Sequence, residues 1–544
     1  MRSRRPSAGV LLVWTLLFLF SVLGAASSNP EQIDNVIFMI LDGVGSYHYE
    51  LTRLVYGELN LDSMYALGWM TTYSADAEIT ESPAAGTALA TGHKTNNVMV
   101  AMSPDGERLK TVLECAQDGG MRTGLITTVM IYDATPAAFA AHNETRYNQT
   151  EIALEMLEQG VDVLLGGGWT LFYDEDLVSR AEQLGYSYVE NEGQLLSVAG
   201  EKVLGLFAPV DMHYELDRHL SREPSIAQMT AKAIELLTTD SDAGFFLMVE
   251  GGKTDWASHR NDAASIAADL KAFDDAVKVA IDFADANGNT LIVVTSDHET
   301  GGLSFAESDG SYIGAFLADV TASAEFMGSQ FDKDRTNVEQ IVSQYTPIGQ
   351  LSRSEIRRIQ DCGSGFEAGA LQPGNTIAAV INGYAKTAFS STYHTAADVP
   401  LFWYGAGAFA YSGGCDNTDV GRDLIGIVTR SGVWSDSVIE WDAAAGYAGT
   451  STSVTGTVES IGSFEGTTYI NLGSAYPAEP RFDVAIPSEC EDAFTARFGR
   501  RPLEFFDEKC VVVHGDIGLS AEGVPYMYLR DPYAIRVLVD CVSE

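Results

Sequence analysis

Short apolar runs alternate with longer amphipathic stretches over roughly the first four fifths of the chain. Most of these runs end at a polar residue or a glycine. Such runs are typical of strands buried on both faces of a largely parallel sheet, and the stretches between them are typical of helices. We therefore predict an α/β fold with a central, largely parallel sheet flanked by helices. The predicted strands are residues 36–41, 124–128, 161–165, 245–250 and 291–296, and the clearest predicted helices are residues 225–237 and 262–286.

The pattern changes after residue 430. Short strand-like segments follow, with one helix-like stretch near residues 489–498. Three strands, a helix and then further strands is the order of an OB-like β-barrel. We therefore expect a large α/β domain over residues 27–440 and a small all-β, OB-like barrel over residues 441–544. The strands predicted in the barrel are residues 453–461, 467–472, 482–486, 510–517, 525–529 and 534–539.

The N-terminus has the pattern of a secretory signal. Arg2, Arg4 and Arg5 precede an apolar run over residues 10–23, and small residues follow as far as Ala26. The run is too short for a comfortable membrane span. We predict that residues 1–26 are a signal peptide cleaved near Ala26. The mature protein would then be secreted, periplasmic or held at the cell surface, without an integral membrane span.

The charge balance excludes nucleic acids as general partners. The chain has 75 Asp and Glu residues against 33 Lys and Arg residues, which gives a formal net charge of −42. Polyanions are repelled by such a charge. The predicted barrel does not escape this argument, because residues 450–544 contain 15 acidic and 7 basic side chains.

The six cysteines are widely spaced and form no Cys-x-x-Cys pair. Outside the cell some of them could pair, and Cys362–Cys415 and two among Cys490, Cys510 and Cys541 are plausible disulfides. For Cys115, on an apolar helical segment, we expect a buried free thiol.

Two positions near the N-terminus are candidates for chemistry. Asp42 follows the first predicted strand and precedes Gly43, which is also the pattern of an ordinary turn. Ser82 stands where a helix N-cap belongs, and Pro83 stands at the first helical position. The helix dipole there would favour a serine alkoxide or a bound phosphate. A plain capping serine is the alternative interpretation.

Carboxylates and histidines recur at metal-ligand spacings further along the chain. Asp133 and Thr135 could turn two oxygens toward one hard cation. Asp255 and His259 are four residues apart, so a helix would place both on one face, as zinc binding requires. Glu250 ends a predicted strand, adjacent Asp297 and His298 follow another, and His394 lies in a later Tyr-His-Thr segment. Histidines more often have structural roles, which we expect for His48, His93, His142, His213, His219 and His514.

Taken in order, these segments resemble the alkaline phosphatase family. The motifs are the Asp after the first strand, the Glu-Ser helix start ending in Ala-Thr-Gly-His-Lys-Thr, Asp-Ala-Thr-Pro-Ala-Ala with its Arg, Glu-Gly-x-x-x-Asp-x-x-x-His, Thr-Ser-Asp-His-Glu-Thr-Gly-Gly and the late His-Thr. They cover residues 34–430. The resemblance implies an exported hydrolase of small phosphate monoesters with two Zn²⁺ and one Mg²⁺. The implied ligands are Asp255, His259 and His394 for one zinc, Asp42, Ser82, Asp297 and His298 for the other, and Asp42, Asp133, Thr135 and Glu250 for magnesium.

The resemblance also implies catalytic roles. Ser82 would attack phosphorus and form a phosphoserine, and Arg146 would hold two phosphate oxygens with its planar fork. The donor types agree with this, since histidine and carboxylate suit zinc and an oxygen-only set suits magnesium. Two positions depart from the family pattern. Glu81 replaces the usual Asp that helps to orient the arginine, and Trp256 stands where other members carry Lys or His.

Two alternative functions share part of this pattern. One is another activity of the same superfamily, such as a phosphodiesterase, a sulfatase or a phosphomutase. Related diesterases commonly have a threonine nucleophile and lack the third metal site. Sulfatases need a Cys/Ser-x-Pro-x-Arg motif for their modified nucleophile, which Ser82-Pro83-Ala84-Ala85 does not match. The other is an envelope binding protein with a vestigial site, although no element of the metal or nucleophile set is missing. A homodimer is a further expectation, because dimers are common in the family.

Overall fold

The computed structural model describes residues 33–239, 243–305, 310–363, 373–406, 413–430, 439–464, 466–478, 480–491, 494–495, 501–506, 509–520, 523–529 and 535–538. The predicted signal peptide and Cys541 lie outside these residues. No helix among the described residues combines the length and the apolar character needed to span a bilayer.

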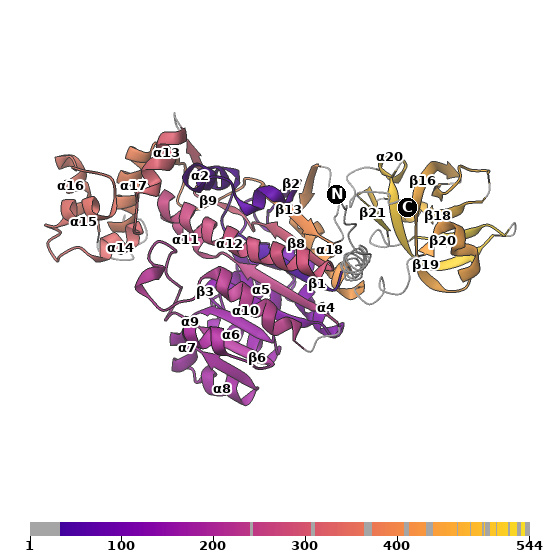
Figure 1. Ribbon diagram of the computed structural model, residues 1–544, viewed down its shortest axis with the longest axis horizontal. Helices are drawn as coiled ribbons and strands as arrows, with labels where there is room; N and C mark the ends of the chain where they lie inside the picture. Colours follow the sequence, from indigo (N-terminus) through magenta and orange to yellow (C-terminus); the bar gives the residue numbers. More distant parts are fainter. Residues whose placement is uncertain are drawn as a thin grey trace, which may run out of the picture.

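A ten-stranded sheet forms the centre of the molecule, with the order β14-β2-β13-β8-β1-β7-β3-β4-β6-β5 (Figure 1). Every strand from β8 to β5 in this order runs parallel to its neighbours. All five apolar runs expected as strands lie in it. The strands are β1 (Asn35–Ile40), β2 (Tyr65–Thr71), β3 (Arg122–Met130), β4 (Val163–Gly167), β5 (Tyr186–Val189), β6 (Lys202–Leu206), β7 (Phe245–Glu250), β8 (Thr290–Thr295), β13 (Val399–Gly405) and β14 (Gly413–Asp416).

Helices cover both faces of this sheet, which explains why its central strands are apolar throughout. On β1, Phe38 packs in a core with Leu89, Phe139 and Leu424, whereas Met39 packs in a second core on the opposite face. The helices around this sheet are α2 (Ser46–Tyr56), α3 (Ser82–Thr91), α4 (Val112–Asp118), α5 (Ala134–Ala140), α6 (Gln149–Glu158), α7 (Trp169–Asp174), α8 (Leu177–Gln183), α9 (Glu192–Ser197), α10 (Ile226–Thr238), α11 (Lys253–His259), α12 (Ala263–Asn287) and α18 (Asn417–Arg430).

The two helices predicted most clearly begin where their capping residues indicate. Ser225 accepts a hydrogen bond from the Gln228 amide at the start of α10, and Asp262 accepts one from the Ser265 amide at the start of α12. These side chains satisfy backbone donors that have no partner inside the helix.

A segment inserted between β8 and β13 packs around a third core. Two short antiparallel pairs lie within it: β9 (Glu299–Thr300) with β12 (His394–Thr395), and β10 (Leu303–Phe305) with β11 (Thr387–Phe389). Helices α14 to α17 lie at one end of the molecule in Figure 1. The helices of this segment are α13 (Gly310–Ala318), α14 (Ala324–Ser329), α15 (Val338–Tyr345), α16 (Arg353–Gln360) and α17 (Pro373–Ala385).

The C-terminal strands form a separate all-β sheet with a core of its own, at the opposite end of Figure 1. The first half of β16 pairs with β19 and its second half with β17, so five strands close on themselves in the order β16-β17-β18-β20-β19. The described part of the expected helical stretch includes the turn η4 (Ser488–Cys490). The strands are β15 (Ile439–Glu440), β16 (Ser451–Phe464), β17 (Thr467–Leu472), β18 (Phe482–Ile486), β19 (Cys510–Leu519), β20 (Pro525–Tyr528) and β21 (Ile535–Leu538), and a short helix, α20 (Pro502–Phe505), precedes β19.

The cysteines correct one expectation and confirm another. Cys362 and Cys415 are both free, so the Cys362–Cys415 disulfide is wrong. The Cys362 thiol bonds to the Ile359 carbonyl after α16, whereas Cys415 lies on the sheet-edge strand β14. Cys115 is a buried free thiol, as expected. Among the last cysteines, Cys490 is free and Cys510 is disulfide-bonded.

Candidate active site

The carboxyl ends of the central strands bring the predicted site residues to one edge of the sheet. Asp42 lies two residues beyond β1, Glu250 ends β7, and Asp297 lies two residues beyond β8. In the parallel register, Ile40 pairs with Glu250 on one side and with Thr295 on the other. The strands β1, β7 and β8 therefore end side by side, and the acidic residues at their ends lie close together. This is the edge at which sites form in open α/β sheets.

Asp42, Asp297 and His298 form a buried group that we call the Asp42 cluster. Their ligand atoms all lie within 4.8 Å of one another. The His298 Nε2 atom is 3.3 Å from Asp297 Oδ2 and 3.7 Å from Asp42 Oδ1. Among the described residues, neither of these two carboxylate oxygens has a hydrogen-bond partner. Two unsatisfied buried oxygens beside an imidazole nitrogen fit a metal ion well.

The electrostatics of the Asp42 cluster favour a bound cation. Burial raises the pKa of Asp42 well above its usual range, and repulsion from Asp297, Asp255 and Glu250 adds to this. Burial and Asp255 likewise raise the pKa of Asp297. Burial lowers the pKa of His298, and the adjacent His394 lowers it further, so the ring is neutral and can act as a ligand. A cation would compensate the mutual repulsion of these carboxylates.

Asp255, His259 and His394 form a second group, the Asp255 cluster. Asp255 and His259 are one turn apart on α11, with the His259 Nε2 atom 3.2 Å from Asp255 Oδ2. The Nε2 atoms of His259 and His394 are also 3.2 Å apart. Although burial opposes it, Asp255 raises the pKa of His259.

Backbone carbonyls fix the orientation of both rings in the Asp255 cluster. The Nδ1 atom of His259 is 2.6 Å from the Thr392 carbonyl, and that of His394 is 2.8 Å from the Thr80 carbonyl. Because a carbonyl only accepts, each Nδ1 carries a hydrogen. The unprotonated Nε2 atoms of both rings are then free to bind a metal next to Asp255. Histidine ligands of metals commonly donate their other ring N–H to a carbonyl or a carboxylate in this way.

Asp133, Thr135 and Glu250 provide only oxygen donors, and we call them the oxygen cluster. Asp133 is the N-cap residue of α5, where its Oδ1 atom accepts from the Ala134 amide at 2.8 Å. The Thr135 hydroxyl is buried and has no hydrogen-bond partner among the described residues. Glu250 accepts a 2.5 Å hydrogen bond from Thr127, and burial together with Asp133 and Asp297 raises its pKa. An oxygen-only set of this kind suits magnesium.

Ser82 lies at the Asp42 cluster, with its Oγ atom 3.1 Å from His298 Nε2. The prediction that Ser82 is an N-cap residue is wrong by one position. Helix α3 begins at Ser82, and Glu81 has the extended backbone of the N-cap residue. Pro83 still lies in the first turn, where the missing N–H of proline costs no hydrogen bond within the helix. Ser82 therefore remains at the positive end of the helix dipole.

Arg146 is oriented by Asp133, whereas the family pattern assigns that role to the residue at position 81. Its Nη2 atom is 2.7 Å from Asp133 Oδ1, and among the described residues no ion pair joins it to Glu81. Burial opposes its charge, but Asp133, Asp42 and Glu81 together raise its pKa, so it stays a cation. Its side chain is 24% exposed and thus open to a ligand.

Sequence reasoning missed three supporting residues. Thr127 holds Glu250, and Thr300 contacts both Asp255 and His298. Glu299 accepts hydrogen bonds from the Gly302 amide and from Thr395, next to His394. The Glu-Thr pair directly after His298 was the available signal. The six histidines expected to be structural lie outside both metal-type clusters.

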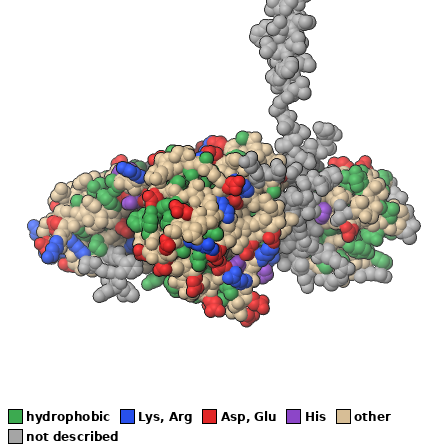
Figure 2. Space-filling view, turned by 90° about the horizontal axis from the view of Figure 1, so that it is seen from below, with side chains coloured by type: hydrophobic (Ala, Val, Ile, Leu, Met, Phe, Trp, Pro, Cys, Tyr) green, Lys and Arg blue, Asp and Glu red, His purple; other side chains and the backbone are tan. Residues whose placement is uncertain are grey.

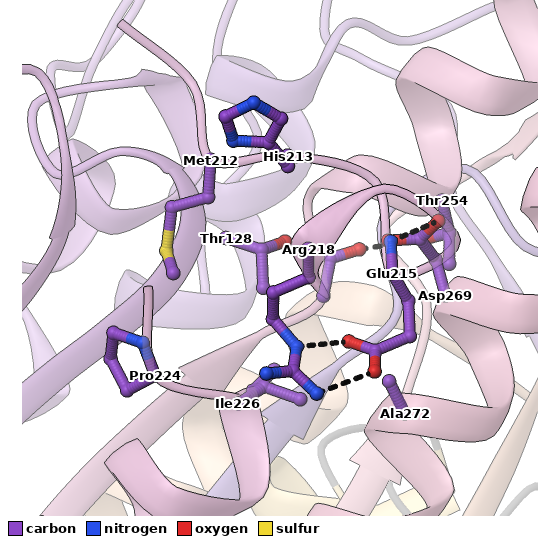
Figure 3. Close-up of a pocket in the computed structure, with 11 residues that line it drawn as sticks. Thr128, Met212, His213, Glu215, Arg218, Pro224, Ile226, Thr254, Asp269 and Ala272 are labelled. Carbon is purple, nitrogen blue, oxygen red and sulfur yellow. Dashed lines mark hydrogen bonds and ion pairs between the residues drawn. The ribbon is translucent and has the colours of Figure 1, made fainter. Parts of the chain in front are cut away.

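A pocket lined in part by Gly251 and Thr254 lies next to the site, and none of the predicted site residues lines it (Figure 3). Thr254, in its wall, donates a 2.5 Å hydrogen bond to the Asp42 carbonyl. Arg218 and Glu215 form a two-fold ion pair across it, with both N–O distances 2.8 Å. Because this ion pair includes no residue of the three clusters, Arg218 can serve as a control position for substitutions in the site.

Comparison with known proteins agrees with this geometry. A sequence model of the alkaline phosphatase family matches residues 33–429. Alkaline phosphatase 3 of Bacillus subtilis (strain 168) is 36% identical over 420 residues, which cover 73% of this chain and 89% of the relative.

Solved structures show the same likeness. The crystal structure of Thermus thermophilus alkaline phosphatase has a TM-score of 0.68 and 30% identity, and the match covers 75% of this chain and 94% of that one. A mutant of the alkaline phosphatase of TAB5, described with Mg bound in the M3 site, has a TM-score of 0.55 and 26% identity, with 74% and 99% covered. These relatives support phosphomonoester hydrolysis as the reaction. The chain therefore belongs to the alkaline phosphatase family and is a phosphatase.

Proposed function

We propose that the chain hydrolyses phosphate monoesters through a phosphoserine on Ser82, at a site that binds two Zn²⁺ and one Mg²⁺. The observation that carries this proposal is the convergence of Ser82, at 3.1 Å from His298, with two adjoining clusters of metal-type ligands. The clusters adjoin because the rings of His298 and His394 stack with centroids 3.7 Å apart. Two adjacent cations suit the attacking and leaving oxygens of an in-line displacement.

The proposed ligands follow the chemistry of each cluster. The Asp255 cluster would hold one zinc, the Asp42 cluster with Ser82 would hold the other, and Asp42 with the oxygen cluster would hold magnesium. In support, the unpartnered oxygens of Asp42, Asp297 and Thr135 are buried, and such oxygens are costly unless something binds them. The mixed nitrogen and oxygen donors fit zinc, and the oxygen donors fit magnesium.

The chain's own residues define the two chemical steps. Ser82 Oγ forms a bond to phosphorus while the bond from phosphorus to the alcohol oxygen breaks. Water then hydrolyses the phosphoserine, which releases inorganic phosphate and restores the hydroxyl. Bound zinc would lower the pKa of the Ser82 hydroxyl and stabilise the leaving oxygen. Arg146, held by Asp133, would orient two phosphate oxygens from the open side of the site.

Substrate attraction has to be local, because the chain as a whole is acidic. Asp and Glu side chains are spread over the face of the main body seen in Figure 2, with Lys and Arg side chains among them. A negatively charged phosphate gains nothing from that average field. Arg146, the start of α3 and the metals would act within a Debye length of about 8 Å at physiological salt.

The proposal is tested with a chromogenic monoester and a matched chromogenic diester, both assayed on zinc- and magnesium-loaded protein. We expect kcat/KM for the monoester to exceed that for the diester by at least about 100-fold, because Ser82 and the oxygen cluster are both present. A preference for the diester would establish the phosphodiesterase alternative. Metal-loaded, folded protein that hydrolyses neither ester would refute the proposal in favour of a vestigial site.

Replacing Arg146 with lysine should weaken phosphate binding and catalysis together. A lysine keeps the charge but cannot place two parallel N–H groups on two oxygens. We expect kcat/KM for the monoester to fall by about 100-fold, equivalent to about 3 kcal/mol, and inhibition by inorganic phosphate to weaken. The measurements are steady-state kinetics and phosphate inhibition constants.

Arg218→Lys is the matched control for that variant. It likewise replaces an arginine that is ion-paired with a carboxylate, here Glu215, but Arg218 lies in the pocket that contains none of the predicted site residues. Its kinetics should stay close to wild type. An unchanged phosphate inhibition constant in Arg146→Lys would remove Arg146 from the proposed site.

We propose that residues 27–440 form the catalytic domain and that residues 441–544 form an OB-like barrel. The barrel would either dock to a partner or stabilise the protein. The closed order of β16, β17, β18, β20 and β19, with its own core, supports this division. Export through the signal-like residues 1–26 and assembly as a homodimer complete the proposal.

A further inference from the structure

One buried hydroxyl connects the two zinc-type clusters. Thr300 on β9 is fully buried, and its Oγ1 atom is 2.6 Å from Asp255 Oδ1 and 3.3 Å from His298 Nδ1. Asp255 belongs to one cluster and His298 to the other. Thr300 therefore touches a ligand of each cluster without belonging to either.

The number of available hydrogens determines which groups donate and which accept in the two contacts of the Thr300 hydroxyl. Thr300 has a single hydroxyl hydrogen, and the short distance to Asp255 assigns it to that carboxylate oxygen. Thr300 can then only accept from His298, so the hydrogen of that ring is on Nδ1. The Nε2 lone pair is left facing Ser82, Asp42 and Asp297. The hydroxyl thus selects the His298 tautomer that can bind a metal from the Ser82 side.

The hydroxyl is held firmly in place. The Thr300 amide donates a 3.0 Å hydrogen bond to the Gly43 carbonyl, next to Asp42. Thr300 is also paired with His394 across the β9–β12 ladder. Its backbone is thus fixed to segments that carry ligands of both clusters.

We infer that Thr300 is a positioning residue that couples the two metal clusters by fixing Asp255 and the His298 tautomer together. The inference rests on the proposed function, since it requires that the clusters bind zinc. Partners of this kind typically contribute 10- to 100-fold in metal affinity. Removing a shared partner should therefore weaken zinc binding at both clusters.

The test compares Thr300→Val, Thr300→Ala and Thr300→Ser with wild type. Apo protein is titrated with Zn²⁺ against a chromogenic chelator, and the two dissociation constants are resolved. Valine keeps the shape without the hydroxyl, alanine avoids strain from the added methyl group, and serine restores the hydroxyl. We expect both constants to rise about 10-fold or more in the valine and alanine variants and to return close to wild type in the serine variant.

Thr230→Val is the control for losing a buried threonine hydroxyl. Thr230 is fully buried in α10, where it donates to the Ile226 carbonyl. This variant should keep both zinc constants even if its melting temperature falls.

The outcomes separate the inference from the function on which it rests. Unchanged constants in Thr300→Val or Thr300→Ala, or a change at one cluster only, would overturn the coupling. A Thr300→Ser protein as weak as the alanine variant would show that packing, and not the hydroxyl, is responsible. If wild type itself bound no zinc, the proposed function would fail first and take the inference with it.

Discussion

Ser82→Ala should yield no covalent phosphoenzyme and should lower turnover of a phosphate monoester by about 1,000-fold or more. Ser82 is buried at the start of α3, and its Oγ atom is 3.1 Å from His298 Nε2, on the side of the ring that faces Asp42 and Asp297. Alanine removes that atom and leaves the helix start and Arg146 in place. Water can still be oriented at such a site, so a small residual rate is expected. Acid quenching followed by mass spectrometry of the peptide around position 82 measures the phosphoenzyme.

Ser225→Ala provides the matched control. Ser225 is also a serine at a helix N-terminus, where it caps α10, but it lies outside the site. It should lower stability by about 1 kcal/mol and leave turnover unchanged. A covalent phosphate trapped on the Ser82→Ala protein would show that another residue is the nucleophile.

The fold could be predicted to the extent that its strands are buried on both faces. The residues of β1, β7 and β8 are buried along their whole length, so their sequences are continuous apolar runs that stand out from the rest. Strand β13 was not predicted. It lies antiparallel between β2 and β8, and its apolar sequence contains Pro400, a residue that argues against an internal strand.

Part of the candidate site could be predicted because Asp42, Glu250 and Asp297 lie at the ends of those same strands. In a parallel sheet, a position directly after one strand is near the position directly after its neighbour. The pairing of Arg146 with Asp133, and not with Glu81, could not be predicted. It depends on where the loop after α5 returns, which is a tertiary property.

Thr300 shows the same limit at the level of a single residue. Its place after Asp297 and His298 is visible in the sequence, but its contact with Asp255 comes from a different part of the chain. Local spacing can identify ligands that share a helix face, such as Asp255 and His259. It cannot identify a hydroxyl that lies between two clusters.

Removing the metals should abolish monoester hydrolysis and also destabilise the folded protein. Asp42, Glu250, Asp255 and Asp297 are all buried within a few residues of the strand ends, and burial with mutual repulsion raises the pKa of Asp42 and Asp297. When free Zn²⁺ is at 100 times the dissociation constant of a site, binding there adds about 2.7 kcal/mol to the free energy of unfolding. Two such sites add about 5 kcal/mol. Over roughly 400 residues the entropy of unfolding is about 0.8 kcal/mol/K, so we expect chelation to lower the melting temperature by about 6 °C. Calorimetry and a monoester assay measure the two effects, and both should return when Zn²⁺ and Mg²⁺ are restored.

A variant without one cluster shows whether the stabilisation comes from these ligands. In Asp255→Asn/His259→Gln the chelator should lower the melting temperature by only about half as much as in wild type, because one of the two zinc sites is already lost. Chelation that shifts both proteins equally would place the metal effect elsewhere in the chain. Protein shown to be metal-free by elemental analysis, yet hydrolysing the monoester at the wild-type rate, would contradict a metal-dependent site. The proposed reaction needs a bound cation to lower the pKa of the Ser82 hydroxyl and to stabilise the leaving oxygen.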